Sequence, residues 1–375
     1  MSNESGDVLP LRRIDHLRFF VGNARQSAYF YRNCFGFDVV AYAGLETKLR
    51  NEAGYVLRQG DITFVIASPL SADHPESQRL VQHGDGVMDV AIEVDDVRAA
   101  YEGAVARGAV GVREPTALED ANGVYELAAI RAYGDTTHTF VNHDRYRGVF
   151  MPGYEPIDPA RYNPATSHPV GLRDIDHIVG NVEEGKMDEW VGYYERVLGF
   201  SQLVSFGDKD ISTEYTALMS KVVQGGNGRI KFPLNEPAKS RRRGQIEEYL
   251  KFYGGPGVQH IALATDDIIA TVRALRANDC SFLRVPKAYY EMLPERVGRI
   301  PEDMQAIAEL GILVDRDDEG YMLQIFTKPV EDRPTLFFEI IQRKGSKSFG
   351  KGNFKALFEA IEREQMLRGT LEANA

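Results

Sequence analysis

The chain is long, acidic and rich in apolar residues: it has 375 residues, of which 43% are hydrophobic, and a formal charge of −11 at pH 7. This length is more than one ordinary core holds, so we expect two domains. The charge argues against a nucleic-acid partner, because few cations are free to neutralise phosphates. One basic run, Lys239–Arg243, is followed by Gly244, and we interpret it as a solvated loop.

Cysteine content and hydropathy predict a soluble protein of a reducing compartment. The two cysteines, Cys34 and Cys280, fall one in each half, which is too few for a disulfide framework. Residues 1–10 lack the apolar core of a signal peptide. No segment approaches the ~20 apolar residues that a membrane-spanning helix needs. We therefore expect a cytoplasmic protein without a membrane partner.

The two halves of the chain repeat each other. The matching segments are Ile14–His16 with Ile175–His177, Val21–Asn23 with Val179–Asn181, Phe35–Phe37 with Leu198–Phe200, Gly86–Ala91 with Gly257–Ala262, and Asp135–Asn142 with Asp332–Glu339. Each copy predicts a strand, a helix and then several strands, with alternating apolar runs such as Ile62–Ile66. Duplication of this kind usually indicates stacked copies of one supersecondary unit.

A proline-rich segment separates the two copies. Residues 151–170 contain five prolines, which exclude a regular helix or a central strand, so we interpret this segment as a linker. We expect an N-terminal domain over 1–150 and a C-terminal domain over 171–375. The repeated unit resembles the βαβββ module of the vicinal-oxygen-chelate superfamily, in which paired modules curl a sheet around a metal. That resemblance implies an α+β fold with two tandem domains; spacing alone would permit other α+β folds.

Three polar residues on apolar strands of the second copy are candidate metal ligands. Beyond the linker the histidines are His177 and His260, each with apolar residues at alternate positions, so both side chains point inward and need a partner. Glu339 lies in the apolar run 335–341, where a carboxylate is rarely left unpaired. Either histidine alone would more often be a core residue bonded to a backbone carbonyl.

Together these donors match the facial triad of non-haem iron enzymes, which leaves three metal positions open for substrate and dioxygen. Tetrahedral zinc is the competing interpretation, although no His-Glu-x-x-His helix occurs. In the first copy His16 keeps the first position, but Asp89 and Asn142 replace the other two ligands. We interpret that set as a vestigial, structural site, with a weak second metal site as the alternative.

Four motifs in the second half carry a resemblance to a known family. They are Gly257–Leu263, Leu323–Pro329, Asp332–Thr335 and Gly350–Phe354. The chain resembles the 4-hydroxyphenylpyruvate dioxygenase family from about Ile14 to Leu371. The resemblance implies one Fe(II) per chain, held by His177, His260 and Glu339. It further implies conversion of 4-hydroxyphenylpyruvate and O2 to homogentisate and CO2 in tyrosine catabolism, and assembly into homodimers or homotetramers.

The resemblance also implies the residues that line the substrate pocket. They are Ser220, Asn235, Gln245, Gln259, Gln324, Phe326, Phe337, Phe349, Asn353 and Phe354, of which Gln245, Gln324 and Asn353 would take part in catalysis. One departure is Gly244, where the family often has serine, and it leaves the loop conformation open. Because Gln259 is adjacent to His260, it would face away from the metal unless its strand bulges. Gln324 lies in a buried-looking run and needs a hydrogen-bond partner there.

The end of the chain predicts an amphipathic helix. Apolar residues recur at helical spacing from Phe354 to Ile361, with Lys355, Glu359 and Glu362 on the opposite face. The preceding Gly345, Gly350 and Gly352 predict a flexible attachment. This helix could simply be packed, or it could act as a lid that shields the metal from water, and both can hold.

Three other functions compete with this interpretation. Hydroxymandelate synthase shares the ligands and the substrate but hydroxylates the benzylic carbon; that family carries isoleucine at Phe354 and lacks the sequence Pro233–Asn235. Phe354 and Asn235 therefore favour ring hydroxylation. A non-catalytic binding module of the same fold would have no reason to keep the ligands. A ring-cleaving dioxygenase shares fold and triad but does not fit the C-terminal motifs.

Overall fold

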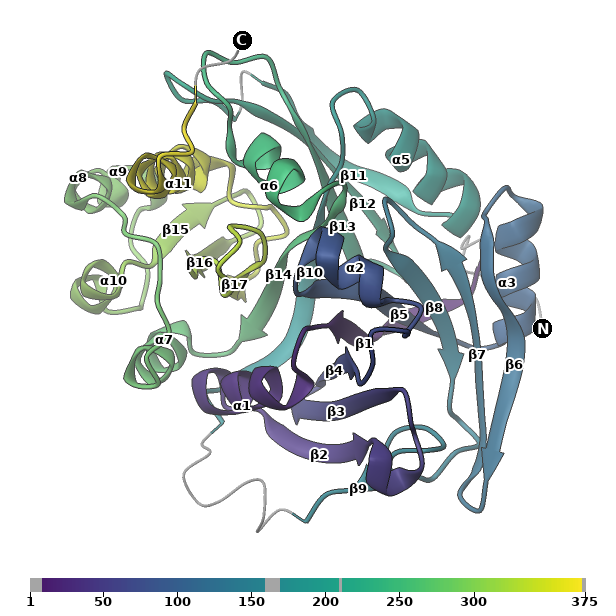
Figure 1. Ribbon diagram of the computed structural model, residues 1–375. Helices are drawn as coiled ribbons and strands as arrows, with labels where there is room; N and C mark the ends of the chain where they lie inside the picture. The colour runs from purple at the N-terminus through teal and green to yellow at the C-terminus, as the bar shows by residue number, and fades with distance from the viewer. Residues whose placement is uncertain (1–8, 159–168, 209–210, 373–375) are drawn as a thin grey trace.

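The computed structural model of the chain contains two curled β-sheets that lie side by side, one from each half (Figure 1). The structure describes residues 9–158, 169–208 and 211–372. The first half comprises β1 (Leu11–Phe20), α1 (Ala24–Phe35), β2 (Asp38–Ala43), a 3-10 turn (Leu45–Thr47), β3 (Glu52–Gln59), β4 (Ile62–Pro69), α2 (Ser77–His83), β5 (Gly86–Val94), α3 (Val97–Ala106), β6 (Gly111–Asp120), β7 (Gly123–Arg131), β8 (Thr137–Asn142) and β9 (Glu155–Pro156).

The second half repeats this order and adds further helices. It comprises β10 (Leu172–Asn181), α5 (Met187–Tyr193), a π-turn (Tyr194–Leu198), β11 (Ser201–Phe206), β12 (Leu218–Gly225), β13 (Ile230–Pro237), α6 (Gln245–Tyr253), β14 (Gly257–Thr265), α7 (Ile268–Ala277), α8 (Lys287–Glu291), α9 (Leu293–Val297), α10 (Met304–Leu310), β15 (Leu313–Arg316), β16 (Tyr321–Phe326), β17 (Phe337–Lys344), a 3-10 turn (Lys351–Asn353) and α11 (Phe354–Arg368).

Strand order confirms the duplication and the α+β fold. The first sheet runs β6-β7-β8-β5-β1-β4-β3-β2-β9 and the second β11-β12-β13-β10-β14-β17-β16-β15. At the centre of each, β1 and β10 pair antiparallel with β5 and β14, which in turn pair parallel with β8 and β17. β8 of the first copy and β17 of the second copy therefore occupy equivalent positions in their sheets. The described part of the linker contributes β9, an edge strand on β2, and residues 159–168 lie outside the described residues.

An aromatic cluster joins the two halves behind β17. The ring of Phe338 is fully buried, and its centroid lies 4.8 Å from that of Phe35 and 5.9 Å from that of Tyr31, both on α1. Phe64 of β4 completes the contact at 6.1 Å. Because Phe338 is adjacent to Glu339 on β17, the N-terminal half supports the back of a strand that carries a candidate ligand.

The two cysteines, isolated in the sequence, meet at this interface between the halves. Cys34 lies in the last turn of α1 and Cys280 follows α7; both thiols are buried, free and in contact with one another. Close by, Asn278 Nδ2 donates to the Cys34 carbonyl at 3.3 Å. Buried apolar residues of both halves belong to one continuous hydrophobic core.

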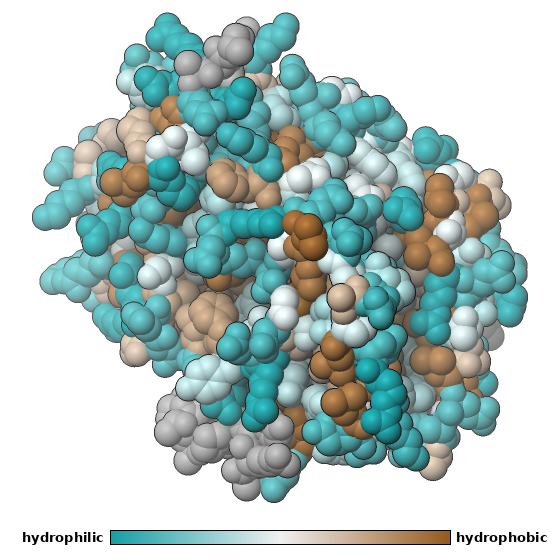
Figure 2. Space-filling view, viewed as in Figure 1, coloured by the Kyte–Doolittle hydropathy of each residue, from teal (hydrophilic) through white to brown (hydrophobic). Residues whose placement is uncertain are grey.

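The surface is largely hydrophilic on the face shown in Figure 2, where apolar side chains gather only in small groups. Such a distribution is ordinary for a globular protein. Within the described ranges, no helix has both the length and the apolar character that a membrane span requires.

The C-terminal helix α11 forms where the periodicity predicted it; between Phe354 and Ile361 its buried residues are Ala356, Phe358, Ala360 and Ile361, while Phe354 and Leu357 are half-buried. One detail of the prediction is wrong. Glu362, expected on the exposed face, is 5% exposed and accepts hydrogen bonds from the hydroxyls of Thr213 and Thr216. These contacts attach the middle of the helix to the segment before β12, a connection between residues too far apart in sequence for periodicity to reveal.

We predict that Phe338→Ala lowers the free energy of unfolding by about 3–5 kcal/mol, because it empties a buried ring site that both halves line. Urea denaturation of the metal-free protein would measure the change. Phe30→Ala is the matched control: its ring is 38% exposed, and its loss should cost about 1 kcal/mol or less. Equal losses for the two variants would contradict a stabilising role for the interface.

Candidate metal centre

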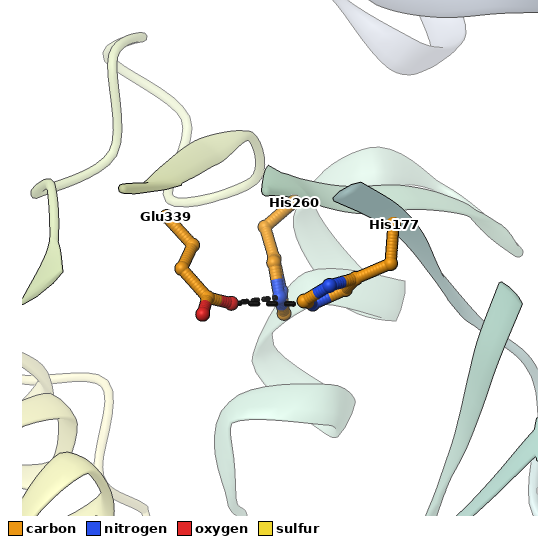
Figure 3. A group of neighbouring side chains, drawn as sticks. All are labelled: His177, His260 and Glu339. Carbon is orange, nitrogen blue, oxygen red and sulfur yellow. Dashed lines mark ion pairs between the residues drawn. The ribbon is translucent and has the colours of Figure 1, made fainter. Parts of the chain in front are cut away.

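Three neighbouring strands bring the predicted ligands together. His177 of β10, His260 of β14 and Glu339 of β17 point toward one another from the concave side of the sheet (Figure 3). Glu339 Oε2 lies 3.2 Å from His177 Nε2 and 3.5 Å from His260 Nε2. The three donor atoms lie within 4.8 Å of one another, close enough to bind one ion. Residues separated by about eighty positions in sequence thus share one site.

Two β-bulges orient the imidazole rings. The pairing of β10 with β14 skips Asp176 on one strand and Gln259 on the other, so each is an extra residue beside a histidine. His177 Nδ1 donates to Asp176 Oδ1 at 2.7 Å, and His260 Nδ1 donates to Gln259 Oε1 at 2.9 Å. With both Nδ1 atoms occupied, both Nε2 atoms are left to face the metal position. The strand of Gln259 bulges, so its side chain lies beside His260 instead of facing away from it.

A buried ion pair supports the first of these rings. Arg343 Nε and Nη2 donate to Asp176 Oδ2 and Oδ1 at 2.7 and 2.8 Å, a bidentate arrangement. Arg343 is the first basic residue after Glu339 on β17. Arg343 forms an ion pair with Asp176. Among the described residues, the basic side chains that pair with Glu339 are the imidazoles of His177 and His260. Asp176 and Arg343 were not predicted as site residues.

Proton affinities in the site suit a cation. Although burial opposes ionisation, contact with His177 and His260 lowers the pKa of Glu339 to about 2. Burial lowers the pKa of His260. Burial also opposes the charged form of His177, but the carboxylates of Glu339 and Asp176 together outweigh it and raise the pKa of His177. The Glu339 carboxylate is therefore ionised at neutral pH. A divalent ion would satisfy all three donors.

A cavity opens on one side of the three donors and contains about 650 Å³ of empty space. All ten predicted pocket residues line it, together with the three ligands: Ser220, Asn235, Gln245, Gln259, Gln324, Phe326, Phe337, Phe349, Asn353 and Phe354. The ring of Phe337 stacks on His260 with centroids 4.8 Å apart. Phe349 meets His177 edge-on at 5.1 Å. A metal held here would face a mostly apolar chamber rather than bulk water.

A chain of amides connects the carboxylate ligand to the C-terminal helix. Gln324 Nε2 donates to Glu339 Oε1 at 2.8 Å, which provides the partner that the sequence required. Asn353 Nδ2 donates to Gln324 Oε1 at 2.9 Å, and Tyr289 Oη donates to Asn353 Oδ1 at 2.7 Å. The second oxygen of Glu339 is therefore held by a hydrogen bond, and so is Asn353, the residue immediately before α11.

Gln245, the first residue of α6, has a comparable place near His260. Its Oε1 accepts a hydrogen bond from Gln259 Nε2 at 3.3 Å, so it fixes the amide orientation that presents Gln259 Oε1 to the ring. Gly244 precedes it with an extended φ of −82° and caps α6, while Glu247 accepts a bond from the Gly244 amide. The departure from serine therefore leaves the helix start intact.

Several lining residues were not predicted as pocket residues. They are Val179, Phe206, Ile211, Leu218, Val222, Pro233, Gly350, Leu357 and Phe358. Most are apolar residues of strands or of α11, and in a sequence they are indistinguishable from core residues. Asp176 could have been found, because its motif Ile-Asp-His is repeated at Ile14–His16, and a repeated acidic residue beside a ligand is a sign of an orienting role.

The matching site in the first half is filled and bonded. His16 keeps its bulge partner, with Nδ1 donating to Asp15 Oδ2 at 2.6 Å. Asp89 instead accepts from Thr139 at 2.8 Å and Asn142 donates to the Val94 carbonyl at 2.9 Å. The ring of Phe150 lies against His16, with centroids 5.1 Å apart. The arrangement supports the interpretation as a vestigial site.

A second group of donors, Asp15, Glu93 and His143, also lies close enough together for a metal among the described residues. Its charges are already compensated. Arg12 and Arg13 donate to the two oxygens of Glu93 at 3.0 and 2.6 Å, and His143 donates to Asp15 at 2.8 Å. Two arginines beside a carboxylate disfavour a further cation, so this group fits a metal less well than the triad does.

Comparisons with known proteins point to one family. The model of the glyoxalase/bleomycin resistance protein/dioxygenase superfamily matches residues 13–126 and 174–325. The chain is 49% identical to a 4-hydroxyphenylpyruvate dioxygenase from Caenorhabditis elegans over 97% of this chain and 95% of that protein. It is 48% identical to one from Dictyostelium discoideum over 95% and 99%. A solved mutant of 4-hydroxymandelate synthase from Streptomyces coelicolor has a TM-score of 0.85 at 34% identity, covering 95% of this chain and 100% of that one.

We predict that Glu339→Gln reduces affinity for Fe²⁺ by more than the ~10–100-fold typical of changes beside a ligand, because it removes a charged donor from the site. Anaerobic calorimetric titration would measure the affinity and the stoichiometry. Glu93→Gln, in the competing group, is the control and should bind one ion per chain as the unmodified protein does. The assignment is wrong if Glu93→Gln loses the ion and Glu339→Gln retains it.

Proposed function

Because the chain belongs to the 4-hydroxyphenylpyruvate dioxygenase family, we propose that His177, His260 and Glu339 hold one Fe(II) ion at its active site. The protein is an enzyme that converts 4-hydroxyphenylpyruvate and O2 to homogentisate and CO2. The reaction combines oxidative decarboxylation, ring hydroxylation and side-chain migration. The observation that supports this proposal best is the open side of the triad, which faces a cavity lined by aromatic rings and a few amides.

The donor set suits this chemistry. Two imidazoles and one carboxylate on one side of an ion leave positions free for a chelating substrate and for O2. When bound, Fe(II) supplies the redox chemistry with O2 and a chelation point for the keto acid of the substrate. Zinc would bind the same donors but has no redox chemistry. Family membership therefore favours iron for this site.

The residues of the chain fix geometry and exclude water. Asp176 and Gln259 hold the imidazole rings, and Gln324 holds the second oxygen of Glu339. These groups keep the donors in one arrangement before substrate arrives, so little reorganisation is needed at the reaction step. Asn353, the residue before α11, donates a hydrogen bond to Gln324 and so links the start of the helix to these groups.

The far part of the cavity suits a phenol. Ser220 of β12 and Asn235 of β13 are directly paired, and both are buried. In the strand order, β12 and β13 lie on the opposite side of β10 from β14 and β17. Ser220 and Asn235 offer a hydroxyl and an amide for the ring hydroxyl of the substrate. Phe337, Phe349 and Phe354 provide apolar surface for the ring itself. Substrate would thus lie with its keto acid at the metal and its hydroxyl toward β12.

We predict that the iron-loaded protein consumes O2 when 4-hydroxyphenylpyruvate is added, with homogentisate as product. An oxygen electrode with Fe(II) and ascorbate would measure uptake, and mass spectrometry would identify the product. Catechol in place of the keto acid tests the ring-cleaving alternative and should give no uptake. An absence of uptake with 4-hydroxyphenylpyruvate, from protein shown to contain iron, would leave a binding module as the remaining interpretation.

Hydroxymandelate formation is the alternative with a specific observation behind it, since a mutant 4-hydroxymandelate synthase shares the fold at a TM-score of 0.85. Phe354 is the residue that separates the two. Its ring lines the cavity at the first position of α11 and packs edge-on against Phe206 at 5.0 Å. A smaller side chain here would leave room for the substrate ring to tilt away from the hydroxylating position.

We predict that Phe354→Ile shifts product from homogentisate toward hydroxymandelate, which product analysis by mass spectrometry would detect. Phe358→Ile, one turn further along α11 and also in the cavity lining, is the control. It should slow turnover without changing the product. If Phe354→Ile gives only homogentisate, Phe354 does not determine the site of hydroxylation.

The cytoplasmic location and the assembly into dimers or tetramers that the resemblance implies stay predictions. The same holds for the domain limits at 150 and 171. We propose them on family membership, with the described strand β9 and the start of β10 consistent with a crossing between the sheets in this region.

A further inference from the structure

Arg343 occupies a position between the metal centre and the segment that leads to α11. It lies on β17 four residues after Glu339, so both side chains project from the same face of the strand. Its side chain is only 19% exposed. Its hydrogen bonds and ring contact divide into two groups, one toward His177 and one toward the loop 345–350.

The first group supports the ligand. Two nitrogens of Arg343 bond both oxygens of Asp176, which accepts the Nδ1 proton of His177. This pairing holds the pKa of Asp176 well below its usual range, even though burial opposes ionisation. The ring of His177 is thus fixed through a charged chain of two residues, whereas the ring of His260 is fixed by neutral amides alone.

The second group fixes the loop. Arg343 Nη1 donates to the carbonyls of Ser346 and Ser348 at 3.2 and 2.7 Å. The guanidinium carbon lies 5.5 Å from the ring centroid of Phe349, which in turn meets His177. One side chain therefore bonds the support of a metal ligand and the backbone before α11.

Asp317 holds the same loop from its other side. Its Oδ2 accepts hydrogen bonds from the Ser348 amide and the Lys347 amide, both at 3.1 Å. Arg343 thus holds carbonyls of the loop and Asp317 holds its amides. The flexible attachment expected at Gly350 stays a prediction. Gly350 has a φ of +74°, and a Cβ there would lie 2.2 Å from Gln324 Oε1, so glycine is needed for close approach.

The first half of the chain offers an internal comparison. Asp15, the counterpart of Asp176, accepts from His16 and His143 rather than from an arginine. Tyr146 stands four residues after Asn142, where Arg343 stands after Glu339, and its hydroxyl donates to Asp120 at 2.9 Å. The arginine thus occurs in the copy that has both a complete triad and a helix over the cavity.

From these contacts we propose that Arg343 is a positioning residue that couples occupation of the metal site to closure of α11. The inference rests on the proposed function, because it takes the triad to be the metal site. An ion at His177 pulls its ring into one orientation, and that orientation is transmitted through Asp176 to Arg343. Arg343 can hold the Ser346 and Ser348 carbonyls only while it keeps this pose. Metal binding therefore stabilises the loop and the start of the helix that covers the cavity.

Hydrogen exchange with and without Fe²⁺ under anaerobic conditions tests the proposal. In the unmodified protein, Fe²⁺ should slow exchange in peptides covering residues 345–368. In Arg343→Gln, Fe²⁺ should bind with affinity reduced by about 10–100-fold, as for other residues that support a ligand, but at saturating metal it should no longer slow exchange in these peptides. Arg343→Lys keeps the charge beside Asp176 but lacks the fork that reaches both carbonyls, so it should regain affinity more than protection.

Arg12→Gln is the matched control, because Arg12 bonds Glu93, Asp95 and Asp144 in the half without the triad. It should behave as the unmodified protein in both measurements. If Arg343→Gln does not fold, Arg343→Lys carries the same comparison. Metal-dependent protection that is unchanged in the Arg343 variants would overturn the coupling. Failure of the unmodified protein to bind Fe²⁺ would instead overturn the assignment of the metal site.

Discussion

The buried carboxylate of Glu339 is the constraint on which the rest of the candidate metal site depends. It is 2% exposed on a strand whose neighbours, Phe338 and Ile340, are fully buried. An ionised group in such a place is costly unless it is bonded on every side. Two imidazoles meet one oxygen and the Gln324 amide meets the other, and a divalent ion would complete the set. The cavity, the amide chain and the start of α11 are all arranged around this charge.

Backbone irregularities make that arrangement possible. A regular strand would turn Asp176 and Gln259 away from the histidines that follow them, whereas a bulge at each position brings them alongside. The rings are then held by hydrogen bonds to Nδ1, and their Nε2 atoms converge. Support continues outward through Arg343 to the loop before α11, and backward through Phe338 to the aromatic side chains of α1. The metal centre is thus fixed by both halves of the chain, although its donors come from one.

The two copies differ in a few side chains at the position of the candidate metal site. Both copies keep the bulge and the histidine, so the backbone geometry of the sheet is shared. In the first copy the neutral Asn142 replaces the carboxylate of Glu339 and bonds a backbone carbonyl, Asp89 bonds Thr139, and Phe150 lies against His16. The second copy keeps charge and space together. Fold alone would not distinguish them; the difference lies in a few side chains.

By itself the sequence determined the duplicated fold, and it predicted the three candidate ligands, because these depend on local polarity in apolar strands. The family resemblance predicted the ten pocket positions. Local periodicity also predicted the first turns of α11, from Phe354 to Ile361, although the helix continues to Arg368. Only the tertiary structure decided the direction of Gln259, the pairing of Arg343 with Asp176 across 167 positions, the burial of Glu362 and the contact of Cys34 with Cys280. Each of these depends on a bulge or on a contact between distant segments. Alternation and periodicity describe one strand or helix at a time, so they carry no information about which distant side chain will meet it.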